Sequence, residues 1–228
     1  YGTGQLILEA IQQGAQTIIL GLGGSATNDG GAGVVQALAG KLLNSKGQEL
    51  SRGGAALSEL ASIDLADIDS RCTDIELIVA CDVDNPLCGD NGASHIFGPQ
   101  KGATPEQVLM LDKALAHFAQ VSESQGCVEG KQSIYERTGY GAAGGTPMGL
   151  SLLFNMQIKP GIEMVLDVLQ ADEIFKGADL VITGEGQMDN QTLQGKTPYG
   201  IAKRASLQGI PTIGIAGSLG TQVEALYS

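Results

Sequence analysis

The hydrophobic and polar positions of the first 43 residues alternate between helical and strand spacing. Residues 3–13 carry apolar side chains on one face of a helix. Residues 17–20 form a short β-branched run that is typical of a buried strand. A glycine-rich loop follows at 21–31, and helical spacing returns at 32–43. Helix, strand, glycine turn and helix in this order predict an α/β protein.

The rest of the chain continues this alternation of predicted strands and helices. The predicted strands cover residues 76–80, 180–183 and 211–216, and the predicted helices cover 105–124, 150–154, 162–169 and 199–207. The helix at 105–124 has a clear start, with Thr104 as its cap, Pro105 at the first position and Gln107 at the third. The polar or glycine-rich stretches at 44–70, 82–104, 126–147 and 184–198 predict loops.

Composition and charge narrow the classes of partner. The net charge of −12 repels nucleic acid and anionic membrane surfaces, so neither is expected as a partner. An anion site must then be local, built from backbone N–H groups and a few Lys or Arg side chains. The 34 glycines are roughly twice the average usage and cluster at the ends of apolar runs.

The cysteines and the apolar segments indicate the cellular compartment of the protein. None of the four cysteines forms a C-x-x-C pair, which favours reduced thiols in a cytoplasmic protein. We find no apolar stretch long enough to cross a membrane and no signal peptide. Because the sequence starts at Tyr1 within a helical pattern, we expect it to be a piece of a longer protein.

The loop at 21–31 is the first candidate for chemistry. Glycines let the backbone approach a phosphate closely, and the following helix directs its N-terminal N–H groups at the loop. A tight packing turn is the alternative. The candidate substrate- or phosphate-binding residues here are Gly23, Gly24, Ser25, Thr27, Asn28 and Asp29.

The same loop loosely fits a dinucleotide pattern, Gly21-x-Gly23-x-x-Ala26. That pattern requires a second strand that ends in an acidic residue about twenty residues on. Glu49 is the nearest acidic residue downstream, but its polar surroundings do not predict a strand. An NAD-dependent dehydrogenase is therefore kept as the alternative enzyme, and a non-catalytic binding module for small anions as the alternative from another class.

Two further candidate site residues lie in the predicted loop that follows the strand at 76–80. Asp82 lies at the carboxyl end of this strand, where α/β enzymes place metal or substrate ligands, and is a candidate Mg²⁺ ligand. Lys101 is a candidate contact for a phosphate or a carboxylate. The small-residue segment at 139–149 predicts either a backbone lining for a ligand or a tight contact between domains, and the sequence does not separate these.

The segment at 183–198 carries the residue types that phosphoryl transfer requires. It is not a P-loop, because Asn190 stands where a glycine is needed. Its carboxylates suit Mg²⁺ or a substrate hydroxyl, and its lysine suits developing phosphate charge. We assign Asp189 and Lys196 as catalytic, Thr192 as substrate-binding and Glu185 as a Mg²⁺ ligand. A structural ion pair between Asp189 and Lys196 is the alternative.

Four segments together resemble one enzyme family. They are GLGGSATNDGGAG, PLxGxxGAxxxFGPQKGA at 86–103, GAAGG, and ADLVITGEGxxDxQTxxGKxPxGIA at 178–202. With these four segments in this order, the chain is similar to the bacterial glycerate kinases that act in the breakdown of glyoxylate, glucarate and galactarate. The resemblance implies ATP, Mg²⁺ and D-glycerate as ligands and 2-phosphoglycerate as product. We expect a cytoplasmic enzyme, with a homodimer as one possible assembly.

The resemblance also implies an α/β architecture with a flavodoxin-like three-layer domain and a second, split α/β domain. We expect residues 1–165 to form the flavodoxin-like domain and 166–228 to be part of the split one. The family's N-terminal APDSFK-like and ADGGEGT-like motifs are absent, so we expect this piece to be inactive alone. We further expect Gly23 to Asp29 and Glu185 to Lys196 to line one cleft, with Asp189 orienting or deprotonating the attacking hydroxyl.

Overall fold

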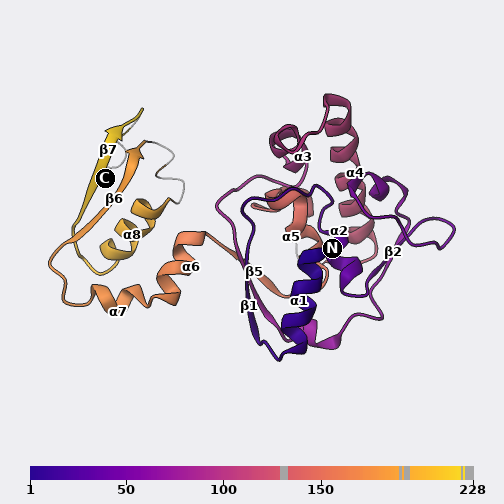
Figure 1. Cartoon of the computed structure of the whole chain (residues 1–228), viewed down its shortest axis with the longest axis horizontal. Helices are drawn as coiled ribbons and strands as arrows, with labels where there is room; N and C mark the ends of the chain where they lie inside the picture. The colour runs from indigo at the N-terminus through magenta and orange to yellow at the C-terminus, as the bar shows by residue number, and fades with distance from the viewer. Residues whose placement is uncertain (129–132, 190–191, 193–195, 222, 224–228) are drawn as a thin grey trace. The chain divides into compact units, whose positions relative to one another are not determined.

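The chain folds into two compact units, Tyr1–Ile158 and Lys159–Ser228. The structure is a computed structural model that describes residues 1–128, 133–189, 192, 196–221 and 223 (Figure 1). Both units combine helices with parallel strands, which confirms the predicted α/β class. The unit boundary precedes helix α6 (Gly161–Val168), whereas the predicted boundary at residue 165 falls inside it. The assignment of the units to the two family domains stays a prediction.

The first unit is built on a three-stranded sheet. Its strands are β1 (Thr17–Gly21), β4 (Glu76–Ala80) and β5 (Met156–Lys159), in the order β1-β4-β5. β1 and β4 run parallel, so their carboxyl ends lie at the same edge of the sheet. The sequence predicted β1 and β4, which are apolar and β-branched. It missed β5, whose four residues include Gln and Lys.

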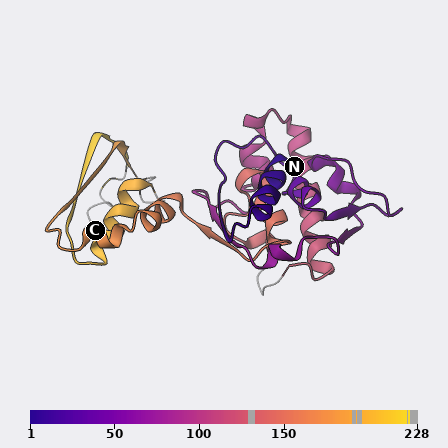
Figure 2. The same cartoon turned by 60° about the horizontal axis from the view of Figure 1, so that its bottom comes forward.

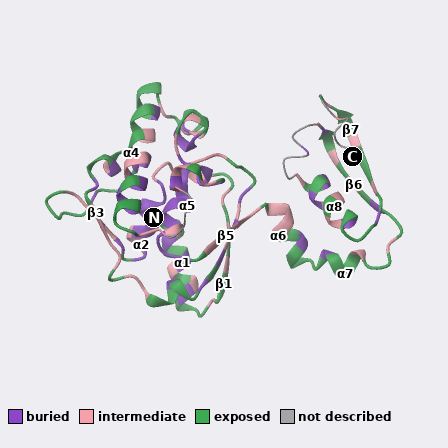
Figure 3. Ribbon diagram, turned by 180° about the vertical axis from the view of Figure 1, so that it is seen from behind, coloured by how far each residue is buried: buried purple, intermediate pink, exposed green. Residues whose placement is uncertain are grey.

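Helices enclose the core of this unit. α1 (Gly2–Gln12) packs on α2 (Ala32–Ala37), and α2 packs on α5 (Thr146–Ser151). The long helix α4 (Pro105–Ser124) begins with the predicted capping box at Thr104. Figure 3 shows the buried residues concentrated between these elements. The largest fully buried side chains include Ile11, Leu77, Leu115, Phe118 and Met148.

The predicted helix at 32–43 is wrong in its second half. α2 ends at Ala37, Ala39 adopts a positive φ of 70°, and the Gly40 N–H donates to the Val35 carbonyl. The chain then enters β2 (Lys41–Leu43), which pairs antiparallel with β3 (Ser62–Asp64). A left-handed residue followed by glycine ends a helix, and the cross-strand partner decides the conformation of the next three residues.

Several short elements lie in stretches that the sequence predicted as loops. The helix predicted at 150–154 is displaced toward the N-terminus: α5 covers Thr146–Ser151, because Pro147 favours the first turn of a helix, and residues 152–154 are not helical. Among the described residues no helix has the length and apolarity needed to span a bilayer. The added elements are α3 (Ala93–Phe97) and the 3₁₀ turns η1 (Gly54–Glu59), η2 (Ser70–Thr73), η3 (Pro99–Lys101), η4 (Ile134–Glu136) and η5 (Ala142–Gly145).

The second unit contains a two-stranded parallel sheet (Figure 2). β6 (Val181–Met188) pairs with β7 (Thr212–Leu219), and α8 (Thr197–Ser206) packs on both. Both strands were predicted but are longer than expected. The predicted loop at 184–198 is wrong over its first five residues, which continue β6. The missed helix α7 (Ala171–Phe175) completes the unit.

Arg204 on α8 ties the helices of this unit together. Its guanidinium donates to Glu163 at 2.6 Å, to Asp167 at 2.8 Å and to Asp172 at 3.1 Å. Hydrogen bonding to Arg204 lowers the pKa of the Asp167 carboxyl. Arg204 therefore links α8 to α6 and α7, which fixes the helix that begins immediately after Lys196.

The glycine-rich loop between β1 and α2 is held by Asp29. The two carboxylate oxygens of Asp29 accept hydrogen bonds from the N–H groups of Gly31 and Gly33, each at 3.0 Å. The Thr27 hydroxyl also donates to this carboxylate at 2.9 Å. Asp29 thus satisfies N–H groups at the start of α2 that would otherwise lack partners.

A second glycine segment packs against the same loop. Gly144 has a φ of +66°, and a Cβ there would lie 2.0 Å from the Thr27 carbonyl oxygen and 2.5 Å from the Asn28 Cα. The Gly30 N–H donates to the Gly144 carbonyl at 2.9 Å. The two backbones can approach this closely only because Gly144 has no side chain.

We predict that Gly144→Ala destabilises the first unit by about 3 kcal/mol or more, since it adds both overpacking and left-handed strain. The matched control is Gly24→Ala, because Gly24 has a φ of +67° but no atom within 4 Å of the added carbon. The free energy of unfolding of Gly24→Ala should fall by only about 1 kcal/mol. Urea denaturation measures both, and equal losses would show that the loop contact is not tightly packed.

We predict that Asp29→Ala lowers the free energy of unfolding by about 1–2 kcal/mol, because it leaves N–H groups of Gly31 and Gly33 unpaired. Asp29→Asn retains one acceptor oxygen, so its free energy of unfolding should fall by less. Thermal and urea unfolding of both variants check this. Unchanged stability in Asp29→Ala would rule out the capping role.

Candidate functional site

A pocket of about 260 Å³ opens at the carboxyl ends of β1 and β4. Five of the predicted site residues line it together: Gly23, Gly24, Ser25, Asp82 and Lys101. They come from three segments that are far apart in the sequence. Space is open around both glycines, since a Cβ on either would meet no atom within 4 Å. Their backbone is therefore accessible to a ligand, as a phosphate or carboxylate site requires.

Lys101 supplies the cation of this pocket. Its ammonium group donates to the Thr27 carbonyl at 2.7 Å. It makes no ion pair with any residue that the structure describes. Burial lowers the pKa of Lys101, and the nearby charge of Asp29 offsets this only in part. A half-buried ammonium without a carboxylate partner is suited to an anionic ligand.

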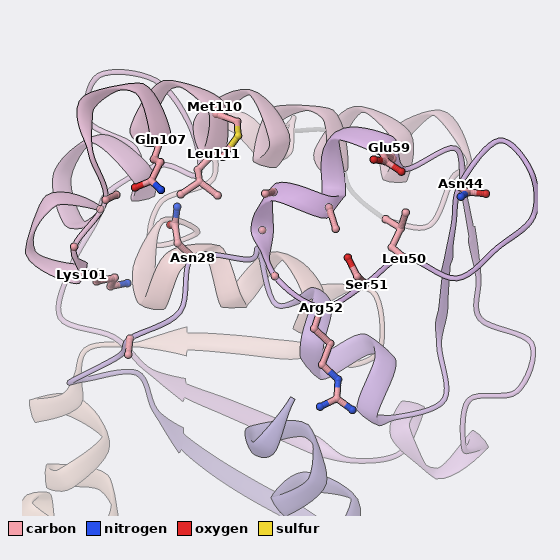
Figure 4. A pocket seen from close by; sticks show the side chains of 18 of the residues that line it. Asn28, Asn44, Leu50, Ser51, Arg52, Glu59, Lys101, Gln107, Met110 and Leu111 are labelled. Atoms are coloured by element: carbon pink, nitrogen blue, oxygen red, sulfur yellow. The ribbon is translucent and has the colours of Figure 1, made fainter.

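The other polar residues of the loop face elsewhere. Asn28 lines a second pocket of about 680 Å³, and Lys101 lines this pocket as well (Figure 4). The Asn28 amide nitrogen donates to the Ser94 hydroxyl at 2.9 Å. Its carbonyl oxygen is buried and has no hydrogen-bond partner within the described part of the chain. The predicted loop site is therefore divided between two pockets, with Lys101 common to both.

Thr27 and Asp29 have structural roles in the folded loop. The Thr27 hydroxyl and both Asp29 oxygens are occupied by the contacts that hold the loop. A direct contact of either side chain with phosphate stays a prediction. In the small-residue segment at 139–149, Gly144 packs on the glycine loop of the same unit, while Ala142 and Ala143 line the smaller pocket. A ligand-lining role of this segment stays a prediction.

Sequence reasoning missed the wall of the larger pocket. Ser51, Arg52 and the Gly53-Gly54 pair line it from a stretch that was predicted as loop. The Arg52 guanidinium lies 3.5 Å from the centre of the Tyr1 ring. A Ser-Arg-Gly-Gly sequence between hydrophobic segments could have signalled this wall, because glycine pairs in loops often allow ligands to approach the backbone.

The predicted residues of the second unit form one hydrogen-bonded group. Thr192 is 1% exposed. Its hydroxyl donates to Glu185 at 2.6 Å and accepts from the Asp189 N–H at 3.1 Å. Thr192 therefore joins the end of β6 to the residue that follows it. Since both functions of its hydroxyl are used, its substrate-binding role stays a prediction.

Lys196 stands near this group at the start of α8. Its ammonium nitrogen lies 3.9 Å from Asp189, and 41% of the Lys196 side chain is exposed. An ion pair of this length near solvent contributes little stability. The geometry thus gives little support to the alternative of a structural ion pair, and Lys196 is accessible. Residues 190–191 and 193–195 of the predicted loop lie outside the described residues.

The two groups of candidate residues belong to different compact units. Their placement across one cleft is therefore still a prediction. Among the described residues, no group of three or more His, Cys, Asp or Glu side chains is arranged to bind a metal. Mg²⁺ commonly needs only one or two carboxylates together with phosphate oxygens and water, so Asp82 and Glu185 stay candidates of that kind.

Comparison with known proteins identifies the family. The family model described as the glycerate kinase family matches residues 1–228. The chain is 51% identical to a glycerate kinase of Bacillus subtilis and 48% identical to a glycerate 2-kinase of Escherichia coli, in each case over 99% of this chain and 58% of the relative. The chain thus spans less than two thirds of the length of these curated relatives.

Comparison with solved structures gives the same family as the sequence comparison. A crystal structure described as that of a candidate glycerate kinase 2 from Salmonella typhimurium LT2 has a TM-score of 0.81 and 44% sequence identity, covering 97% of this chain and 60% of the other. A further curated relative, a glycerate kinase of Halalkalibacterium halodurans, is 49% identical over 100% of this chain and 59% of its own length. The chain belongs to the glycerate kinase family.

Proposed function

We propose that the complete protein transfers the terminal phosphoryl group of ATP to D-glycerate and releases 2-phosphoglycerate. The observation that carries this proposal is the pocket at the ends of β1 and β4, where accessible glycine backbone, Asp82 and the half-buried ammonium of Lys101 converge. Relatives at about half identity are named glycerate kinases, which supports the acceptor. A cytoplasmic place in the breakdown of sugar acids is part of the same proposal.

The chemistry expected of this pocket is positioning and charge stabilisation. Glycerate and the ATP phosphates are all anionic, and phosphoryl transfer spreads negative charge over the oxygens of the moving group. Backbone N–H groups at Gly23 and Gly24 and the Lys101 ammonium would hold such charge. Mg²⁺, when bound, would neutralise phosphate charge, with Asp82 and Glu185 as its candidate ligands.

We assign the hydroxyl chemistry to the second unit. Asp189 would orient or deprotonate the attacking hydroxyl, and Lys196 would stabilise charge on the transferring group. The Thr192 hydroxyl and backbone hold Glu185 and Asp189 in one group, which supports joint action. This assignment requires the two units to close on one ligand pair.

The activity is proposed for the complete protein, and residues 1–228 alone are proposed to be inactive. The chain spans 58–59% of the length of its relatives. In the second unit, one face of the sheet leaves Ile182 62%, Ile213 49% and Ile215 61% exposed. Apolar side chains on one sheet face usually pack against another layer, which supports the proposal that this unit is part of a larger split domain.

A coupled assay of ADP release by the complete protein, with D-glycerate and other hydroxy acids, tests the reaction. Lys101→Met should lower kcat/KM at least about tenfold, because it removes the shared cation. Its unfolding free energy should change by less than about 1.5 kcal/mol, since only one hydrogen bond is lost. Lys113→Met, an exposed lysine on α4, is the matched control. NAD reduction without ADP release would instead support the dehydrogenase alternative.

The roles in the second unit predict that Asp189→Ala and Lys196→Ala each reduce kcat at least about tenfold, which corresponds to about 1.4 kcal/mol or more. Glu173→Ala and Lys176→Ala remove an exposed ion pair of the same unit and serve as controls. Steady-state kinetics of the complete protein measure all four. Near-normal turnover in both test variants would remove these residues from the mechanism.

A further inference from the structure

The 680 Å³ pocket has no role in the proposed reaction so far. It lies between η1 and the first turns of α4, and the glycine loop reaches it through Ala26 and Asn28. Pockets for cofactors and similar ligands commonly measure about 300–1,000 Å³, so this one has room for a large ligand. The neighbouring 260 Å³ pocket is below that range and suits a small acid or a single phosphoryl group.

The larger pocket has two chemically different ends (Figure 4). Lys101, Asn28 and Gln107 lie at one end, which offers an ammonium and amide groups. Glu59, Ser51 and Asn44 lie toward the other, which offers a carboxylate, a hydroxyl and an amide. The first end suits an anion. The second suits a neutral group that carries hydroxyl or amino hydrogens, because Glu59 can only accept hydrogen bonds when ionised.

Apolar side chains connect these ends. Met110 and Leu111 line the stretch between them, Leu50 lies beside Ser51 and Glu59 at the second end, and small residues of η1 also line the pocket. A flat, partly apolar ring can pack against such a surface. The combination of an anionic end, an apolar ring and outward hydroxyl and amino groups is that of a nucleotide. Glycerate has the anionic end and the hydroxyls but no ring.

Lys101 connects the two pockets. It lines both, and its ammonium is fixed on the Thr27 carbonyl of the loop that runs between them. A lysine carries three N–H donors, so one can hold the loop while others face ligands. A cation on the boundary could contact a phosphate in the larger pocket and an acid or a transferred phosphoryl group in the smaller one.

We propose that the larger pocket binds the nucleotide, with its base and ribose between Leu111 and Glu59 and its phosphates directed to Lys101, while the smaller pocket binds glycerate. This inference rests on the proposed kinase function and adds to it which pocket takes which substrate. Lys101 is then the contact that both ligands share at the site of transfer.

Ala55→Trp in the complete protein tests the assignment. Ala55 is exposed and lines the larger pocket, so an indole there fills ligand space with little effect on the core. We expect the KM for ATP and the calorimetric Kd for ADP to rise at least about tenfold. The KM for D-glycerate should change by less than about twofold, since the smaller pocket is untouched. Leu109→Trp, on α4 and 55% exposed outside the pocket lining, is the control.

A reporter variant keeps the test independent of folding and of turnover. These 228 residues contain no Trp, so Met110→Trp, which lines the pocket, adds a local fluorophore. ADP should shift the emission of Met110→Trp relative to the parent and leave that of Leu109→Trp unchanged. A rise in the KM for D-glycerate alone, or no effect of ADP on Met110→Trp together with unchanged ADP affinity of Ala55→Trp, would overturn the assignment. If the complete protein binds ADP here but phosphorylates no hydroxy acid, the proposed function fails and the nucleotide pocket stands.

Discussion

The hydrogen bond from the Lys101 ammonium to the Thr27 carbonyl is the contact on which the first unit's site depends. It joins residues 74 positions apart and brings a cation from η3 to the glycine loop after β1. The loop itself is rigid at this point, because Asp29 fixes it to α2 and Gly144 packs directly on the Thr27 backbone. Lys101 therefore has a fixed position from which it lines both pockets.

The same contact places an ammonium group at the glycine loop of a chain whose 228 residues have a net charge of −12. A field of that sign repels anions at long range, so an anion site of the kind proposed must be local. A half-buried ammonium without a carboxylate partner among the described residues has lost part of its hydration and gains most from an incoming anion. Backbone N–H groups at accessible glycines add to this attraction without adding net charge. Binding of an anion at this site would therefore depend on these local groups.

The second unit uses a different means of fixing its polar residues. Thr192 is buried and its hydroxyl connects the Glu185 carboxylate to the backbone N–H of Asp189, which holds the two residues close together. Arg204 fixes α8 against α6 and α7 at the other end of the same helix. Lys196, at the start of α8, is left in a loose contact of 3.9 Å with Asp189. An anchored carboxylate and an accessible lysine suit a site that must exchange its ligands.

The sequence by itself determined the α/β class, the main strands, the capped helix α4 and the family, because these follow from local periodicity and from long motifs whose residues are adjacent in the chain. It also named Gly23, Gly24, Asp82 and Lys101 as candidate site residues, but only the folded chain brings them to the lining of one pocket. β2 replaced half of a predicted helix because its partner β3 lies about twenty residues away, and such pairing energy is not visible locally.

Only the tertiary structure decided which polar groups are used up and which are available. Asp29 and Thr192 have the residue types of ligand-binding groups, yet Asp29 accepts bonds that hold the loop and the Thr192 hydroxyl donates to Glu185. Lys101 has the residue type of a solvated surface lysine, yet it is half-buried between two pockets. Arg52 lines the larger pocket from a stretch predicted only as loop, where the Gly53-Gly54 pair was the sole local signal. Composition and spacing give the chemistry of a side chain, but burial and the partners that folding brings near it decide whether that chemistry is free to act on a ligand.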